Sequence, residues 1–270
     1  MSFLEHLEEL RWHLIRALVA IMVFAILAFV FREFFFQEII FAPTRVDFVT
    51  FKAFCKLSQL TGSDAFCVDE LPLTLQNRTM TGQFTMAITA AFILGIIIAF
   101  PYVFWEIWRF VSPGLYETER RVSKGAVFFV SVLFLTGVSF GYFVVVPVSV
   151  NFLANFTLSP EIDNQFDITS YVSTMAMMVL GSGLLFQLPM VIYFLTSAQI
   201  VTPSFLVRYR RHAIVVILII AAIVTPPDVF SQILISIPVY LLYEISIYIS
   251  KITLRKVKKK EALMESGIEL

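Results

Sequence analysis

Long apolar runs separated by short charged segments make up most of this 270-residue chain. Asp, Glu, Lys and Arg are absent from residues 17–31, 79–105, 125–160, 168–207 and 229–243. A helix needs roughly 20 apolar residues to cross the hydrocarbon core of a bilayer, whereas a barrel strand needs only about 10. The pattern therefore predicts a polytopic membrane protein of the all-α class.

We expect six transmembrane helices, of which the last two are short. As a helix, residues 212–226 extend only about 22 Å, against a hydrocarbon core of about 30 Å. Such a short pair thins the bilayer locally or is shielded by longer neighbours. The expected spans are 15–37, 84–105, 125–152, 170–195, 212–226 and 229–249.

Composition argues against the main structural alternative, a large soluble helical protein. The chain is 59% hydrophobic and only 15% charged, with a mean hydropathy of +0.85. These values leave too little polar surface for a soluble domain of this length. The acidic residues Glu5, Glu8 and Glu9 precede the first apolar run, which is the wrong charge for a cleaved signal peptide.

The positions of Lys and Arg predict the orientation in the membrane. The connections 153–169 and 226–228 contain no basic residue. Basic residues gather instead before the first span, at 106–124, at 208–211 and in the KITLRKVKKK tail. The positive-inside rule therefore predicts that both termini are cytoplasmic.

The expected organisation is one transmembrane domain over residues 1–250, with an outer loop at 38–83 and a charged cytoplasmic tail at 251–270. An amphipathic helix at 2–14 precedes the first span. Its apolar stripe consists of Phe3, Leu7, Leu10 and Leu14. This helix is an interfacial anchor with a solvated charged face, or that face is a binding surface, and the pattern alone leaves both open.

One acid, Asp228, interrupts the apolar end of the chain in the sequence TPPDVFSQ. Pro226 and Pro227 end one helix, and Asp228 can cap the next helix by accepting backbone N–H bonds. An acid at a recessed membrane surface can also have a function. The residues themselves are compatible with both interpretations.

The only two cysteines, Cys55 and Cys67, lie in the outer loop. In an oxidising compartment they predict a disulfide that closes about a dozen residues and stabilises the loop by roughly 3 kcal/mol. The alternative is a metal site, but further ligands at a suitable spacing are lacking, and we expect none. No phosphate-binding loop, metalloprotease motif or nucleophile with a base is recognisable, so we expect neither catalytic residues nor cofactors.

Several motifs, in their order along the chain, resemble the TatC family, the multispanning core subunit of the twin-arginine protein translocase. HLEELRWHL is similar to the family's HLxELRxRL, and FAP at 41–43 resembles a segment of its first loop. FPYVFWEIWRFVSPGLYETERR resembles the second span and the loop after it, and GYFVVVPVSVNFL resembles the end of the third span. TPPDVFSQILISIPVYLLYE is close to a verbatim family signature.

The resemblance implies a non-enzymatic role in protein export across the bacterial cytoplasmic (inner) membrane, driven by the proton-motive force. TatC proteins bind the twin-arginine signal peptides of folded precursors at the cytoplasmic face and assemble with single-span TatA- and TatB-type subunits. Self-association, contact with membrane lipid and no nucleic-acid partner are expected. The signal-binding positions would be Glu9, Arg11, Phe110, Glu119 and Arg121. The outer-face positions for assembly and transport would be Pro43, Asp228 and Gln232.

Four features depart from the family pattern. Gln187, in FQLP, stands where the fourth span commonly carries an acid, which puts in doubt any role that needs a titrating group there. His13 replaces the second arginine of the N-terminal motif, and Glu106 stands where many members have glutamine. The loop that contains the cysteines is longer than usual.

A secondary transporter or channel is the rival class, in which Asp228, Gln187 and Glu244 would mark a substrate path. Against it, no internal repeat of hydropathy is obvious, and no charge lies in the middle of a span. An intramembrane enzyme is a third class, but a catalytic constellation for it is lacking.

Overall fold

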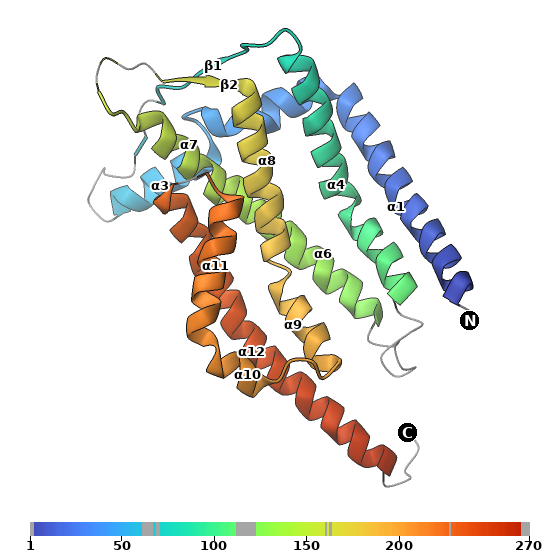
Figure 1. Ribbon diagram of the computed structural model, residues 1–270. Coiled ribbons are helices and arrows are strands. Elements are labelled where there is room, and N and C mark those ends of the chain that lie inside the picture. Colours follow the sequence, from blue (N-terminus) through green and yellow to red (C-terminus); the bar gives the residue numbers. More distant parts are fainter. Residues whose placement is uncertain are drawn as a thin grey trace. The chain divides into compact units, whose positions relative to one another are not determined.

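The computed structural model describes residues 3–60, 67–68, 71–111, 123–159, 161, 164–226 and 228–265. It is mostly helical and consists of two compact units, Met1–Gly181 and Ser182–Leu270 (Figure 1). Among the described residues, five helical segments are long and apolar enough to cross a membrane. These are Glu8–Val30, Gly82–Val111, Gly125–Asn155, Ile168–Ser197 and Val229–Lys259.

The elements follow one another along the chain with short connections. The first unit contains α1 (Phe3–Val30), α2 (Arg32–Phe34), the π-helix η1 (Phe35–Ile40), the 3-10 helix η2 (Ala42–Thr44), α3 (Val49–Leu60), β1 (Thr74–Gln76), α4 (Gly82–Val111), α6 (Ser123–Phe140), the π-helix η4 (Gly141–Val145), α7 (Val146–Asn155), β2 (Gln165–Asp167) and most of α8 (Ile168–Leu185). The second unit contains α9 (Leu188–Ser197), α10 (Pro203–Arg208), α11 (Arg210–Val224) and α12 (Val229–Glu265).

Two of the predicted boundaries are wrong at the ends of the chain. The expected surface helix at 2–14 and the first span form one unbroken helix, α1, which ends at Val30 instead of residue 37. Phe3–Val30 contains no Gly or Pro, so nothing in the sequence interrupts it. The expectation of a short sixth helix that ends at 249 is also wrong, because α12 has 37 residues and continues to Glu265 through a basic segment rich in good helix formers.

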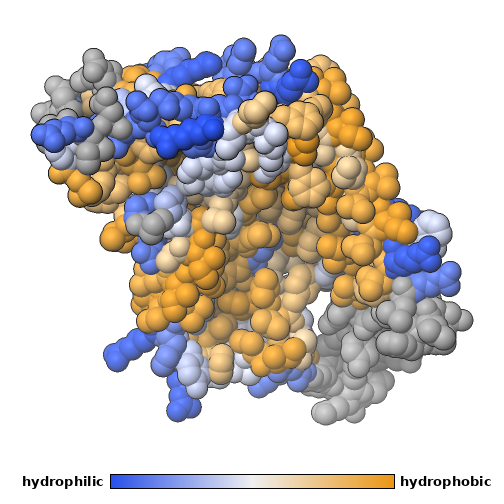
Figure 2. Space-filling model, turned by 45° about the horizontal axis from the view of Figure 1, so that its top comes forward, coloured by the Kyte–Doolittle hydropathy of each residue, from blue (hydrophilic) through white to orange (hydrophobic). Residues whose placement is uncertain are grey.

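The surface of these helices is largely hydrophobic, as Figure 2 shows for the face turned to the viewer. Large side chains that a soluble protein would bury are exposed, such as Ile26 at 58%, Phe128 at 65% and Ile219 at 56%. Apolar exposure over such an extent is typical of helices in contact with lipid.

α1 and α4 lie side by side and antiparallel, and small residues set their separation (Figure 1). Ala25 of α1 is buried, as are Ala91, Gly95 and Ala99 of α4. A Cβ atom added at Gly95 would lie 2.8 Å from the backbone nitrogen of Ala25 and 2.8 Å from the backbone oxygen of Ile21. The two backbones therefore approach as closely as they do only because residue 95 lacks a side chain.

The segment predicted as the outer loop contains a packed helix, α3. Cys55 of α3 is joined to Cys67 by a disulfide. The Thr50 hydroxyl donates a hydrogen bond to the Phe143 carbonyl of η4, and the ring of Phe48 stacks on that of Phe143 at 6.0 Å between centroids. The disulfide thus closes part of the loop on itself, while the contacts of Thr50 and Phe48 attach α3 to η4.

A short parallel pairing of β1 with β2 is the one departure from an all-α fold in the described part of the chain. The Gln76 amide donates to the Gln165 side-chain oxygen at 2.7 Å, and the Arg78 backbone N–H donates to Asp167 at 3.3 Å. Asp167 also accepts hydrogen bonds from the hydroxyl and the backbone N–H of Thr169, which hold the pKa of Asp167 below its usual value.

In the second unit, α12 is the helix against which α9, α10 and α11 pack. The hydroxyls of Thr196 and Ser250, both buried, lie 2.8 Å apart between α9 and α12. The Tyr243 hydroxyl donates to the Leu206 carbonyl of α10 at 2.8 Å. Hydroxyl groups therefore form hydrogen bonds that join α9 and α10 to α12.

Candidate functional site

A pair of ionisable side chains joins the start of α1 to the end of α4. His13 Nδ1 lies 2.5 Å from Glu106 Oε2, and the two side chains are only 11% and 1% exposed. Tyr102, one turn before Glu106 on α4, adds a second hydrogen bond to the same carboxylate. We call this arrangement the His13–Glu106 pair.

The residues around this pair include one of the predicted signal-binding positions. Phe110 lies one turn after Glu106, and its ring centroid is 6.3 Å from that of His13. Arg109 is exposed and places its guanidinium over the Trp105 ring at 4.9 Å. An aromatic and cationic surface thus borders the buried carboxylate.

The other predicted signal-binding positions divide between α1 and the connection after α4. Glu9 is half-buried and lies one helical turn before His13, and Arg11 is exposed on the same helix. Glu119 and Arg121 lie outside the described residues. The structure therefore brings the first turns of α1 near Phe110. Glu119, the second acidic position, comes after Val111, the last residue of α4, in the sequence.

Asp228 and Gln232 lie together at the start of α12 in the second unit. Asp228 is 8% exposed, and its Oδ1 accepts the Ser231 backbone N–H at 2.6 Å, which confirms the expected helix cap. Its Oδ2 has no hydrogen-bond partner within the described part of the chain. The Gln232 amide donates to the Leu218 carbonyl at 2.9 Å and so joins α12 to α11.

Pro43 and Gln187 occupy breaks between helices. Pro43 is buried in η2 of the first unit, and the Thr44 hydroxyl beside it donates to the Phe41 carbonyl at 2.7 Å. Gln187 lies in the turn between α8 and α9, where its carbonyl accepts the Met190 N–H at 2.9 Å. The predicted fourth span of 170–195 is therefore two helices with a break at this amide.

Glu244, considered as part of a transport path, is already engaged. Its two carboxylate oxygens accept hydrogen bonds from Arg210 at 2.7 Å and from the Tyr240 hydroxyl at 3.0 Å. The ion pair is partly exposed, at 44% for Arg210 and 31% for Glu244. It fixes the first turn of α11 to the middle of α12 and leaves little carboxylate capacity for a substrate.

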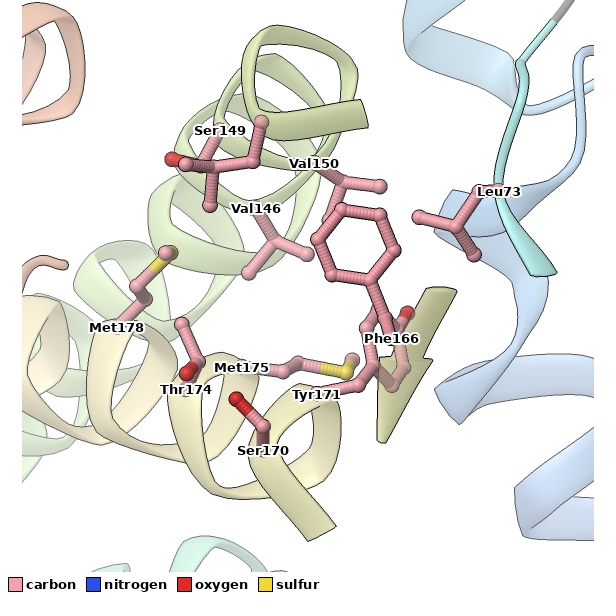
Figure 3. Close-up of a pocket in the computed structure, with 11 residues that line it drawn as sticks. Leu73, Val146, Ser149, Val150, Phe166, Ser170, Tyr171, Thr174, Met175 and Met178 are labelled. Atoms are coloured by element: carbon pink, nitrogen blue, oxygen red, sulfur yellow. The ribbon is translucent and has the colours of Figure 1, made fainter. Parts of the chain in front are cut away.

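The cavity of Figure 3 is small and mostly apolar. It has a volume of about 60 Å³ and lies between α7 and α8, with Phe166 of β2 at its side. Of its polar groups, the Ser149 hydroxyl donates to the Val145 carbonyl and the Tyr171 hydroxyl donates to the Ile40 carbonyl. Across the described ranges, no group of three or more His, Cys, Asp or Glu side chains could hold a metal ion.

Sequence reasoning missed the His13–Glu106 pair and the Arg210–Glu244 ion pair. His13 and Glu106 were each recognised as a departure from a family pattern, but 93 positions separate them and nothing in one sequence links them. For Arg210 and Glu244 the separation is 34 positions. A charged residue within an apolar helix is the sequence feature that indicates such a pair, because a charge there needs a partner, which can be far away in the sequence.

The comparison with known proteins decides the family. The family model of "Sec-independent protein translocase protein (TatC)" matches residues 5–238. This chain belongs to the TatC family. It is 39% identical over 252 residues to TatC of Blattabacterium sp. subsp. Periplaneta americana, an alignment covering 93% of this chain and 95% of that protein. It is 35% identical over 262 residues to TatCy of Bacillus subtilis, covering 97% and 93%.

Solved structures agree with the sequence relatives. A crystal structure described as Twin Arginine Translocase Receptor- TatC matches with a TM-score of 0.69 at 30% identity, covering 92% of this chain and 99% of that chain. The same receptor crystallised in DDM matches with a TM-score of 0.70. The chain is thus an integral membrane subunit of a Sec-independent protein translocase, in agreement with its apolar helices.

Proposed function

We propose that this TatC-family chain is the receptor for twin-arginine signal peptides within its translocase. The observation that carries the proposal is the pairing of α1 with the end of α4, which brings the helix with Glu9 and Arg11 beside Phe110. The connection with Glu119 and Arg121 follows directly after Val111, at the same end of α4. In this proposal Glu9 and Glu119 bind the two guanidinium groups of the peptide, because a planar guanidinium pairs bidentately with a carboxylate.

The membrane setting belongs to the same proposal. The chain has six spans in the bacterial inner membrane with both termini cytoplasmic, so that the receptor site faces the compartment in which precursors fold. The basic segments support this orientation. α11, with only 15 residues, would be the short fifth span.

The opposite membrane face would serve assembly and transport. Pro43, Asp228 and Gln232 are the positions proposed for contacts with TatA- and TatB-type single-span subunits and with further copies of the chain. The unpaired Oδ2 of the buried Asp228 supports a polar contact there, since a buried acceptor gains from a donor. Export itself would draw on the proton-motive force, with Gln187 serving by hydrogen bonding or packing.

Crosslinking of a twin-arginine precursor to membranes that contain each variant tests the receptor assignment. Glu9→Ala or Glu119→Ala leaves one guanidinium half-paired, so we expect a ten- to hundredfold loss of affinity, about 1–3 kcal/mol, in protein that still inserts. Asp228→Ala is the matched control and should keep the crosslink while export fails. If both glutamate variants crosslink as well as the wild type, the receptor does not lie here.

A further inference from the structure

Glu106 is a carboxylate buried at the contact between two helices that leave little room for adjustment. It is 1% exposed, in a span whose backbone approaches α1 closely at Gly95. A buried carboxylate that loses its partner is strongly destabilising. The position of His13 on α1 is therefore tied to Glu106, because no other side chain of α1 is seen to bond this carboxylate in the described part of the chain.

His13 also faces the receptor site proposed above. Its Nδ1 bonds Glu106, and its ring centroid is 6.3 Å from that of Phe110, which lies one turn after Glu106 on α4. One turn earlier on α1 is Glu9. We therefore expect a displacement of His13 to move Glu9 of α1 and Phe110 of α4.

We propose that His13 and Glu106 act as one positioning pair that holds Glu9 and Phe110 in the geometry for the twin-arginine peptide. The inference rests on the proposed receptor function. Neither residue touches the peptide, so their effect on binding passes through the placement of α1 on α4.

Peptide affinity of the purified full chain in nanodiscs tests the coupling. His13→Leu removes the partner on α1 and leaves Glu106 with the hydrogen bond from Tyr102, and it should weaken binding of a synthetic twin-arginine signal peptide at least tenfold. His13→Gln retains an N–H donor and should stay within threefold of wild type. The double variant His13→Leu/Glu106→Gln also lacks the pair and should bind about as weakly as His13→Leu, because two residues that act as one unit do not add their losses.

Distances between spin labels give a readout of placement that does not depend on the peptide. Labels at Leu14→Cys and Ile107→Cys report the end of α1–α4 near the pair, and labels at Ile26→Cys and Ile88→Cys report the far end. All four residues are exposed, and the native cysteines are bonded to each other. In His13→Leu the first distance distribution should broaden while the second keeps its wild-type width, which separates positioning from general unfolding.

The outcomes distinguish this inference from the receptor function. If the wild type binds twin-lysine and twin-arginine peptides equally, or Glu9→Ala binds like wild type, the receptor function fails. If those controls behave as expected but His13→Leu binds normally, the positioning pair is rejected. The same holds if the double variant binds like the wild type, or if both label pairs broaden together.

Discussion

Asp167 and Asp228 use a carboxylate in the same way at the starts of two helices. Asp167 accepts the Thr169 N–H at 2.8 Å at the start of α8, and Asp228 accepts the Ser231 N–H at 2.6 Å at the start of α12. Each bond satisfies one backbone donor that the helix itself cannot satisfy. Neither acid needs a substrate to explain its presence, so a role for Asp228 depends on its remaining oxygen.

The Asp167 cap should depend on pH. The hydrogen bonds from Thr169 hold the pKa of this carboxyl below the usual value of 3.8, so its stabilising effect is complete above that pH. The effect is lost as the pH falls further, through the lowered pKa. Hydrogen exchange should therefore show protection of the Thr169 amide at pH 7 that declines in acid.

Asp167→Asn is the matched control, because asparagine caps a helix without titrating. Its Thr169 amide should keep the same protection across the acid range. A decline in the variant as steep as in the wild type would show that the Asp167 carboxyl is not the cause.

The Asp228 cap and the His13–Glu106 pair differ in whether one sequence is enough to predict them. The cap by Asp228 could be predicted, since proline before it and apolar residues after it define a helix start locally. The His13–Glu106 pair could not, because its members meet only when α1 and α4 are placed side by side. Local chemistry is readable from one sequence, whereas a contact across helices requires the fold.

At the scale of elements, apolar runs predicted the helices but not their interruptions. The third expected span, 125–152, contains the π-helix η4, and the fourth is broken at Gln187. The first of these irregular turns, η4, forms hydrogen bonds with residues outside its own apolar run. The Tyr142 hydroxyl donates to the Ile39 carbonyl at 2.9 Å, and Thr50 bonds the Phe143 carbonyl of η4. A hydropathy profile does not reveal hydrogen bonds between residues that are far apart in the sequence.

The α1–α4 contact should tolerate no side chain at Gly95. Gly95→Ala forces a Cβ against backbone atoms that have no flexible end to move, and we expect a loss of roughly 1–3 kcal/mol in unfolding free energy. Gly125→Ala in α6 is the control, because the nearest atom to its added Cβ is a Phe129 ring carbon at 4.0 Å. That change should be neutral or stabilise by up to about 1 kcal/mol.

Unfolding in mixed micelles of both variants measures the difference directly. If Gly95→Ala is as stable as Gly125→Ala, then the backbones of α1 and α4 do not approach each other as closely at Gly95 as described. Since Gly95 lies three turns from Glu106, the same protein should also bind a signal peptide more weakly if α1 shifts along α4.

For the whole molecule, the number of spans decides which face each terminus occupies. Within the described residues, five segments are long and apolar enough to cross a bilayer, and α11, at 15 residues, is not among them. A five-span chain would put its termini on opposite sides, whereas six spans put them on the same side. The basic residues at 208–211 and in the tail both flank the last two helices, which favours a short hairpin that crosses and returns.

Reporter fusions at three positions distinguish the two topologies. A reporter after residue 200 follows four spans, and one after residue 270 follows all of them, so six spans predict the same cytoplasmic signal from both. A reporter after residue 160 is the internal control and should give the opposite signal, since three spans precede it. Opposite signals after residues 200 and 270 would mean that α11 does not cross. The Asp228 turn would then lie on the cytoplasmic side, and its proposed role at the outer face would have to be abandoned.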